Sequence, residues 1–258
     1  MILDTRRFRL HLKTETLGHS LHLFESVDST NRVALEFLRE GAAEGTTVLA
    51  ERQTGGRGSN GRTWQSEPGG LYLSVLLRPE LVPQEVFQLT LVAASGIARS
   101  LGRATGVPVR LKWPNDLVVE GDGGLGKLGG ILTETRIQGG RLVGAVVGIG
   151  VNWKNPVPPP GVCLTDLTDR SLDLATVAAA VLSGLEESYH TWKRRGIDQT
   201  IAVYERFLVN LGQAVQLPGH DCEGRVIGVD AQGRLRLMFL DGHEALVDPQ
   251  QVRLGYGS

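Results

Sequence analysis

The sequence has little cysteine, no surplus of charge of either sign and no long apolar run. Its 258 residues include two cysteines, Cys163 and Cys222, which lie far apart and form no CxxC pair. The six histidines show no HExxH or HxxxH spacing. Neither a disulfide framework nor a thiolate or histidine zinc site is therefore expected.

The charges nearly cancel, with 27 basic and 28 acidic residues and a pI of about 6.6. Because binding to a phosphate backbone needs clustered Lys and Arg, no nucleic-acid partner is expected. No run approaches the ~18–20 apolar residues of a membrane span. Residues 1–7 lack the apolar core of a signal peptide. The sequence predicts a soluble cytoplasmic protein in a reducing compartment, with no membrane contact.

Glycine, in contrast, is abundant: 34 of the 258 residues, or roughly 13%, against a usual ~7%. Twenty of these glycines fall between residues 55 and 150. Glycine allows positive φ and close approach of backbone to a ligand. The excess therefore predicts that ligand contacts are concentrated in this part of the chain.

The hydrophobic pattern predicts a mixed α/β domain followed by a small β-barrel. Strands are expected at 20–27, 46–50, 71–77, 109–113, 117–120, 128–137 and 142–151. Helices are expected from a cap at Asp28 or Ser29 to Gly41, and at 84–105, 172–194 and 198–210. Short strands separated by turns are expected at 214–217, 224–229, 235–240 and 244–247. We therefore divide the chain into domains 1–210 and 211–258.

The stretch 53–64, QTGGRGSNGRTW, combines glycines with two arginines and a tryptophan. Its four glycines can bring amide N–H groups close to a ligand, and Arg57 and Arg62 suit carboxylate or phosphate oxygens. Trp64 can wall a flat, uncharged ring. The pattern is neither a P-loop nor a dinucleotide-binding GxGxxG motif. An anion-binding loop is favoured, and a flexible surface loop is the alternative.

Residues 112–116, KWPND, lie at the end of a predicted strand and place three polar side chains close together. Lys112 supplies a positive charge, while Asn115 and Asp116 supply an amide and a carboxylate. These groups suit a base edge, a hydroxyl or Mg²⁺. A proline-nucleated turn capped by Asn and Asp is an equally good interpretation of the spacing alone.

Two further glycine-rich stretches follow. Residues 121–132 are typical of a hairpin in which Lys127 enters the returning strand, where a single lysine is more often solvated than functional. Residues 147–153 place two glycines in an apolar strand, which indicates close approach by a bulge or a ligand. Asn152 then emerges at the end of that strand.

The order of these motifs closely resembles that of the biotin protein ligases (biotin–[acetyl-CoA-carboxylase] ligases). The resemblance runs from about residue 20 to the last residues given. It rests on Ser29-Thr30-Asn31, Gln53–Gly58 with Gly61-Arg62 and Trp64, Lys112–Asp116, Gly126–Leu132 and Gly148–Asn152. The implied fold is α+β: a mixed-sheet catalytic domain related to class II aminoacyl-tRNA synthetases, followed by an SH3-like β-barrel.

The resemblance implies a two-step reaction with ATP, biotin and Mg²⁺. The biotin carboxylate attacks the α-phosphate of ATP, giving biotinyl-5′-AMP and pyrophosphate. A lysine of the biotin carboxyl carrier protein of acetyl-CoA carboxylase then takes the acyl group and releases AMP. Such chemistry needs positioning and charge neutralisation more than a covalent nucleophile. The protein is expected to be a monomer or a homodimer.

The resemblance also assigns roles to individual residues. The implied catalytic residues are Lys112, Lys127, Arg57 and Arg62. The implied biotin contacts are Ser29, Thr30, Gln53, Gly56, Arg57, Trp64, Lys127 and Gly129. The implied nucleotide contacts are Arg62, Lys112, Asn115, Asp116 and Asn152, with Asp116 as a magnesium ligand.

The sequence departs from the family pattern in two places. Ser59 stands where most members carry an arginine that helps to retain the adenylate, so weaker retention is expected, unless Asn60 or another loop residue compensates. Only about 20 residues precede the first catalytic strand, so no DNA-binding domain and no repressor role are expected. A lipoate or octanoate ligase, or a non-catalytic sensor of biotin or adenylate, are the alternative functions.

Overall fold

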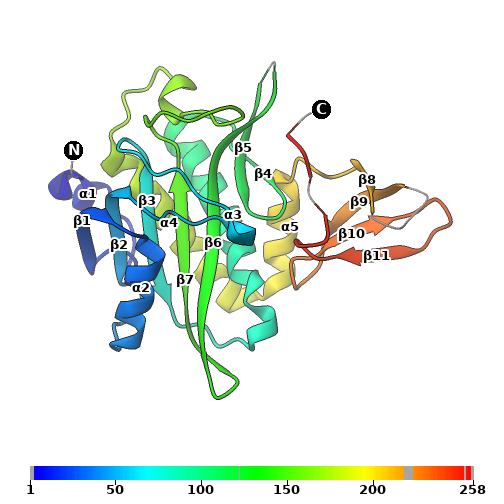
Figure 1. Ribbon diagram of the computed structural model, residues 1–258, viewed down its shortest axis with the longest axis horizontal. Helices are drawn as coiled ribbons and strands as arrows, with labels where there is room; N and C mark the ends of the chain where they lie inside the picture. The colour runs from blue at the N-terminus through cyan, green and yellow to red at the C-terminus, as the bar shows by residue number, and fades with distance from the viewer. Residues whose placement is uncertain (1–2, 122, 218–222, 253, 257–258) are drawn as a thin grey trace.

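A central seven-stranded sheet organises the first three fifths of the chain in the computed structural model, which describes residues 3–121, 123–217, 223–252 and 254–256. The strand order is β1-β2-β3-β7-β6-β5-β4 (Figure 1). The bounds are β1 Leu21–Val27, β2 Thr47–Gln53, β3 Leu71–Leu77, β4 Arg110–Lys112, β5 Asp116–Gly121, β6 Gly124–Gln138 and β7 Arg141–Val151. Strands β1 and β2 are parallel and the other neighbours antiparallel, so the predicted mixed α+β class is confirmed.

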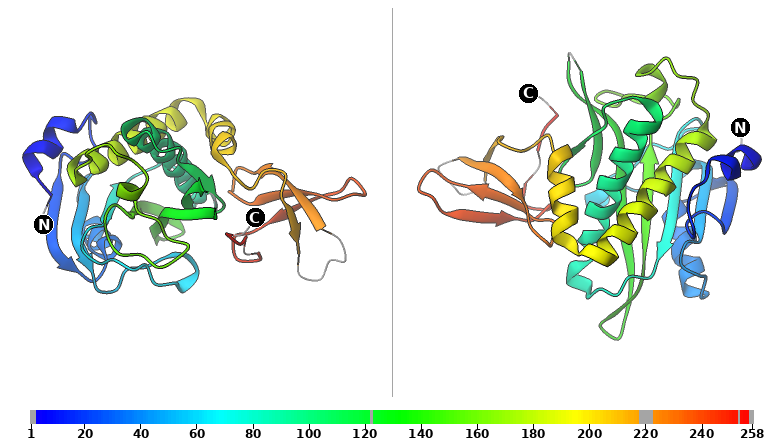
Figure 2. Two further views of the ribbon diagram at one scale, coloured as in Figure 1. Left: turned by 90° about the horizontal axis from the view of Figure 1, so that it is seen from above. Right: turned by 180° about the vertical axis from the view of Figure 1, so that it is seen from behind.

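Helices cover both faces of this sheet. The long helices α3 (Phe87–Thr105) and α4 (Leu174–Arg195) lie across one face (Figure 2, right), and α2 (Thr30–Arg39) packs on the opposite face against β2, β3 and β7. Alternate residues of β3 and β7 enter the large core beside α3 and α4, because successive side chains of a strand point to opposite faces. The opposite face of these strands, which includes Ser74, Gly148 and Gly150, is covered by α2 over part of its area.

A four-stranded antiparallel sheet, in the order β11-β10-β9-β8, follows the last helix. The remaining bounds are α1 Thr5–His11, α5 Ile197–Phe207, β8 Ala214–Gln216, β9 Glu223–Val229, β10 Leu235–Met238 and β11 Glu244–Val247. The Trp113 indole N–H donates to the carbonyl of Gly233 at 2.9 Å, and the Trp113 amide donates to Asn210 Oδ1 at 2.8 Å. These contacts fix the second sheet beside the end of β4.

The predicted strands are confirmed, with small shifts at their ends. Strand β3 has the predicted bounds, whereas β6 begins four residues earlier than predicted, at Gly124. The predicted helix 84–105 begins as a short 3₁₀ turn at 83–85 and continues as α3. Helix α1 was not predicted. Within the described residues, no helix is both long and apolar enough to cross a lipid bilayer.

One row of aligned residues crosses the open face of the sheet. The register pairs Lys112 with Asp116, Asp116 with Gly130, Gly130 with Gly150 and Gly150 with Tyr72. The row therefore has two charged residues at its β4–β5 end and two glycines in the middle. The row is therefore charged at one end and has no side chains at its two central positions.

Candidate active site

A single pocket collects most of the motif residues on this open face. It holds about 640 Å³, including the open space at its mouth. The loop 54–64, which the sequence predicts to bind a ligand, crosses in front of β7 and β6 and forms one wall (Figure 1). The lining residues include Ser29, Thr30, Asn31, Gln53, Arg57, Ser59, Arg62, Trp64, Asn115, Asp116, Lys127, Gly130, Leu132, Gly148 and Gly150.

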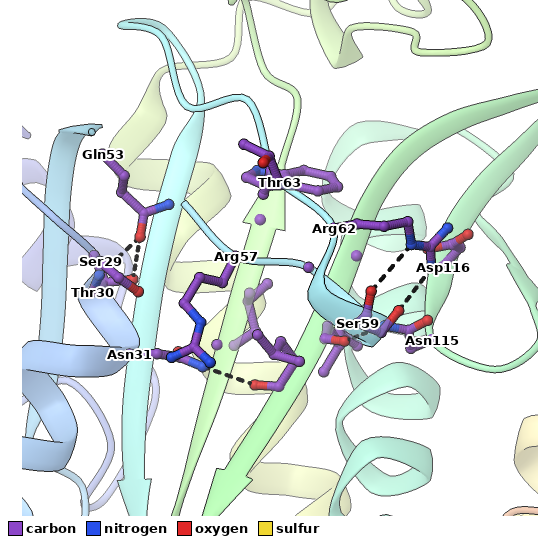
Figure 3. A pocket seen from close by; sticks show the side chains of 18 of the residues that line it. Ser29, Thr30, Asn31, Gln53, Arg57, Ser59, Arg62, Thr63, Asn115 and Asp116 are labelled. Carbon is purple, nitrogen blue, oxygen red and sulfur yellow. Dashed lines mark hydrogen bonds between the residues drawn. The ribbon is translucent and has the colours of Figure 1, made fainter. Parts of the chain in front are cut away.

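The pocket has two chemically different ends (Figure 3). Ser29, Thr30 and Gln53 lie at one end, whereas Arg62 and Asp116 lie at the other. The first end is neutral and offers hydroxyl and amide groups. The second end offers guanidinium, ammonium, amide and carboxylate groups. A ligand with a neutral polar head and an anionic tail matches this polarity.

A chain of hydrogen bonds orients the neutral end. Gln53 Oε1 accepts from the Thr30 amide at 2.8 Å and from the Thr30 hydroxyl at 3.0 Å, and Gln53 Nε2 donates to Ser66 Oγ at 2.8 Å. Ser74 Oγ donates to Thr30 Oγ1 from below at 2.8 Å. Ser29 is the N-cap of α2, yet its side chain forms no capping hydrogen bond, so its hydroxyl is free to face the pocket. Such bonds preorganise polar groups for a small ligand.

Two residues that sequence reasoning did not assign lie beside this end. Asn31 Nδ2 donates to Glu134 Oε2 at 2.8 Å, and Arg57 Nη1 lies 3.1 Å from Glu134 Oε1. The carboxylate of Glu134 thus joins α2 to the loop. Asn31 was part of the quoted Ser-Thr-Asn motif, and Glu134 follows Gly130 at period-two spacing on the same face of β6. This motif and this spacing are the sequence features that could have indicated Asn31 and Glu134.

Trp64 lies over the two central glycines of the sheet. A Cβ atom at Gly150 would come within 2.6 Å of the Trp64 indole, and one at Gly130 would come within 3.4 Å. At Gly148 a Cβ would lie 2.1 Å from Asn31 Oδ1. The sequence predicted that a bulge or a ligand comes close to β7. In the structure, the groups that come close are the side chains of Trp64 and Asn31. These glycines allow Trp64 and Asn31 to reach their positions.

The charged end is built around Asp116, whose side chain is 6% exposed. Lys127 Nζ lies 2.7 Å from Asp116 Oδ1 and 5.3 Å from the centre of the Trp64 ring. Lys112, paired with Asp116 in the register, is buried with 4% exposure. Burial lowers the pKa of the Lys112 ammonium, an effect that Asp116 opposes and that Lys127 and Arg62 reinforce. Lys127 is thus part of the site and not a solvated hairpin lysine.

Tyr256, another residue that sequence reasoning missed, reaches this charged end from beyond β11. Its hydroxyl donates to Asp116 Oδ2, and its ring centre lies 4.4 Å from Lys112 Nζ. Burial, followed by the charge of Asp116 and the hydrogen bond to it, raises the pKa of the Tyr256 hydroxyl well above its usual value. A single tyrosine near the end of the sequence given carried no pattern that could have indicated this contact.

Ser59 anchors the neighbouring Arg62. Arg62 Nη2 donates to Ser59 Oγ at 2.8 Å, and Arg62 Nε donates to the Ser59 carbonyl at 3.1 Å. Asn60 adopts φ of 57° inside this turn, a conformation that asparagine tolerates better than most residues. The turn therefore holds Arg62 at the pocket wall without a second arginine.

Four of the assigned residues do not line the pocket: Gly56, Lys112, Gly129 and Asn152. Gly56 is buried beside Trp64 and lines a neighbouring groove, and Gly129 packs against the carbonyl of Gly150. Asn152 Nδ2 donates to the Lys127 carbonyl at 3.1 Å, so it holds the strand that presents Lys127. The assigned contacts of these four residues with substrates stay predictions.

Two polar atoms of residues that line the pocket have no partner among the described residues, which also indicates a ligand. Trp64 Nε1 and Asn115 Oδ1 are buried, and neither forms a hydrogen bond within the described part of the chain. Unpaired buried polar atoms are rare in folded proteins. No three His, Cys, Asp or Glu side chains of the described residues cluster as a metal site. Asp116 is the carboxylate on the pocket wall.

Comparison with known proteins identifies the family of this chain. The family model for the biotin/lipoate A/B protein ligase family matches residues 23–152, about half of the chain. The chain therefore belongs to the biotin/lipoate A/B protein ligase family.

Within this family the similarity is to the biotin protein ligases. The biotin–[acetyl-CoA-carboxylase] ligase of Mycobacterium tuberculosis is 33% identical over 248 residues, covering 91% of this chain and 90% of the relative. The bifunctional ligase/repressor BirA of Bacillus subtilis is 31% identical over 251 residues, covering 93% and 76%. The structure of the Aquifex aeolicus biotin protein ligase in complex with biotin and ATP has a TM-score of 0.71 and 29% identity, covering 89% and 95%.

Proposed function

We propose that this protein is an ATP-dependent biotin protein ligase that biotinylates a lysine of a biotin carboxyl carrier protein. The observation that carries the proposal is one pocket with a neutral hydrogen-bonding end and a charged end, separated by Trp64. Biotin has this polarity, because a neutral ureido ring lies at one end and a carboxylate at the other. The named relatives support the same conclusion.

The neutral end serves to hold the biotin ring system. Ser29, Thr30 and Gln53 supply hydroxyl and amide partners for the ureido group, with the backbone around Gly56 and Arg57 completing its surroundings. Trp64 packs against the apolar part of the ligand and extends over Gly130 and Gly150. Burying the ligand against an indole excludes water from the reacting carboxylate. Gly129 belongs to the backbone beneath this wall.

The charged end serves to hold ATP and to carry out the transfer. A biotin carboxylate oxygen attacks the α-phosphorus, and pyrophosphate leaves. Lys127 neutralises the carboxylate and the charge that develops on the acyl phosphate, while Arg57, Arg62 and Lys112 contact phosphate oxygens. Asn115 and Asn152 serve the nucleotide. In the second step the ε-amine of the carrier lysine attacks the acyl carbon, loses a proton and displaces AMP.

The charged end fits Mg²⁺ because it supplies one carboxylate, that of Asp116. Magnesium in nucleotide sites is commonly held by one or two carboxylates together with substrate phosphates and waters. Asp116 is the carboxylate on the pocket wall, and its oxygens are engaged by Lys127 and Tyr256. Asp116 would thus hold the ion only together with a bound triphosphate, whose charge the ion would offset.

The finer features of the architecture also belong to this proposal. We assign residues 1–210 to a catalytic domain related to class II aminoacyl-tRNA synthetases and residues 211–258 to an SH3-like barrel. The four-stranded antiparallel sheet β8–β11 supports the second assignment. A cytoplasmic location and a monomer or homodimer complete the proposal.

The first test is biotin labelling of a carrier domain. We expect the protein to transfer radiolabelled biotin to an isolated biotin carboxyl carrier domain when ATP and Mg²⁺ are present, because every proposed contact serves that reaction. Labelling should disappear without ATP and when the acceptor lysine is changed. Incorporation of lipoate or octanoate in place of biotin would contradict the assignment, and so would biotin binding without any adenylate formation.

A second prediction concerns retention of the adenylate. Ser59→Arg should slow dissociation of biotinyl-5′-AMP about tenfold, because one charge-assisted contact contributes roughly 1.5–3 kcal/mol. The rate can be followed by release of radiolabelled adenylate into excess unlabelled adenylate. An unchanged rate would contradict this prediction.

A further inference from the structure

The segment that follows β11 returns to the charged end of the pocket. It passes from the second sheet to the β4–β5 end of the seven-stranded sheet (Figure 1). Val252 and Leu254 pack against the main core, and the Leu125 amide donates to the Tyr256 carbonyl at 3.4 Å. Tyr256 is thereby held beside the start of β6, close to Asp116 and Lys112.

The Tyr256 side chain engages both of these charged groups at once. Lys127 lies on one oxygen of Asp116 and the Tyr256 hydroxyl on the other. The Tyr256 ring covers the ammonium of Lys112. An aromatic face attracts a cation, and a buried carboxylate is stabilised by donors on each oxygen. Tyr256 thus supplies partners for two charges that would otherwise be buried with fewer contacts.

The same contacts conflict with the proposed roles of Lys112 and Asp116 in nucleotide binding. Lys112 is 4% exposed, does not line the pocket and has the Tyr256 ring centre 4.4 Å from its ammonium, so a phosphate that contacts Lys112 from this side must take the place of the ring. Asp116 has no oxygen free of a donor. If these two residues meet ATP and its metal ion, Tyr256 must leave first. This conflict exists only under the proposed function.

We propose that Tyr256 occupies part of the nucleotide subsite in the nucleotide-free protein and that ATP binds by displacing it. Tyr256 then competes with ATP for the same subsite. A site that is competent only in a fraction of the molecules binds its ligand more weakly by that fraction. Removing the competitor therefore strengthens nucleotide binding and leaves the neutral, biotin-binding end unchanged.

The test measures nucleotide affinity directly. Tyr256→Ala should bind α,β-methylene ATP with Mg²⁺ about tenfold more tightly than the unaltered protein in calorimetric titrations. Tyr256→Phe, which retains the ring and loses the hydroxyl, should lie between the two. Tyr189→Phe is the matched control, because the Tyr189 hydroxyl also donates to a carboxylate, that of Glu44, at 2.7 Å. The control should bind the analogue as the unaltered protein does.

A second measurement needs no variant. Hydrogen–deuterium exchange of peptides covering residues 248–256 should increase when α,β-methylene ATP and Mg²⁺ are added, and biotin alone should not change it. Equal or weaker nucleotide binding by Tyr256→Ala, with biotin affinity and melting temperature retained, would overturn the proposal. Protection of 248–256 by the nucleotide would do the same. Failure of the proposed function is distinguishable, since the unaltered protein would then make no biotinyl-5′-AMP.

Discussion

Lys127→Ala should lower the rate of biotinyl-5′-AMP formation by about a thousandfold. The Lys127 ammonium is the positive charge next to both Trp64 and Asp116, so it lies where a ligand carboxylate would meet a phosphate. Removing one preorganised group that stabilises developing charge costs roughly 10²–10³ in rate. The variant also leaves the carboxylate of Asp116 facing the incoming carboxylate. Single-turnover formation of adenylate from radiolabelled ATP measures the effect.

Three variants separate charge from folding in this experiment. Lys13→Ala removes an exposed lysine far from the pocket and should leave the rate unchanged. Lys127→Arg keeps the charge and should restore part of the rate. Lys127→Ala combined with Asp116→Asn should be less impaired than the sum of the two single changes, because contacting residues are not additive. A Lys127→Ala protein that forms adenylate at the normal rate would show that another cation serves the carboxylate.

Much of the fold was predictable because its signals are local. The strand at 71–77 is buried on both faces and apolar except for Ser74, and Gly70 and Pro79 mark its two ends. Helix α1 escaped prediction because it has seven residues with Phe8 as its buried side chain, too few to show a helical period. The sequence feature that could have indicated this helix is its N-cap residue Asp4, whose carboxylate accepts hydrogen bonds from the amides of Arg6 and Arg7.

The site was predictable to the extent that each motif carries its own chemistry. The loop 54–64 and the Lys112–Asp116 turn combine charged groups within a few residues, and the structure brings both to one pocket. Glu134 and Tyr256 were missed because their partners lie 77 and 140 positions away in sequence. Such contacts depend on how β6 and the segment after β11 pack. A single sequence without an alignment shows no trace of them.

Gly150→Ala should weaken biotin binding about fiftyfold or more, although it adds one methyl group. The new Cβ would lie 2.6 Å from the Trp64 indole, so the ring must leave its place over β7. If displacement removes ~100 Å² of apolar contact with the ligand, the loss is roughly 2.5 kcal/mol at ~25 cal/mol per Å². Isothermal titration with biotin measures the change. Gly150 is required at this position because the Trp64 ring lies over it.

Gly144→Ala is the matched control for this prediction. It lies on the same strand and the same face, and its Cβ would come within 2.8 Å of Leu38 in the α2 packing, away from the pocket. We expect it to lower the melting temperature and to leave biotin affinity intact. In a Trp64→Ala background, Gly150→Ala should cost little further affinity, since the ring that it displaces is already gone. Equal losses in both backgrounds would show that Gly150 acts on the ligand directly, through the strand itself and not through Trp64.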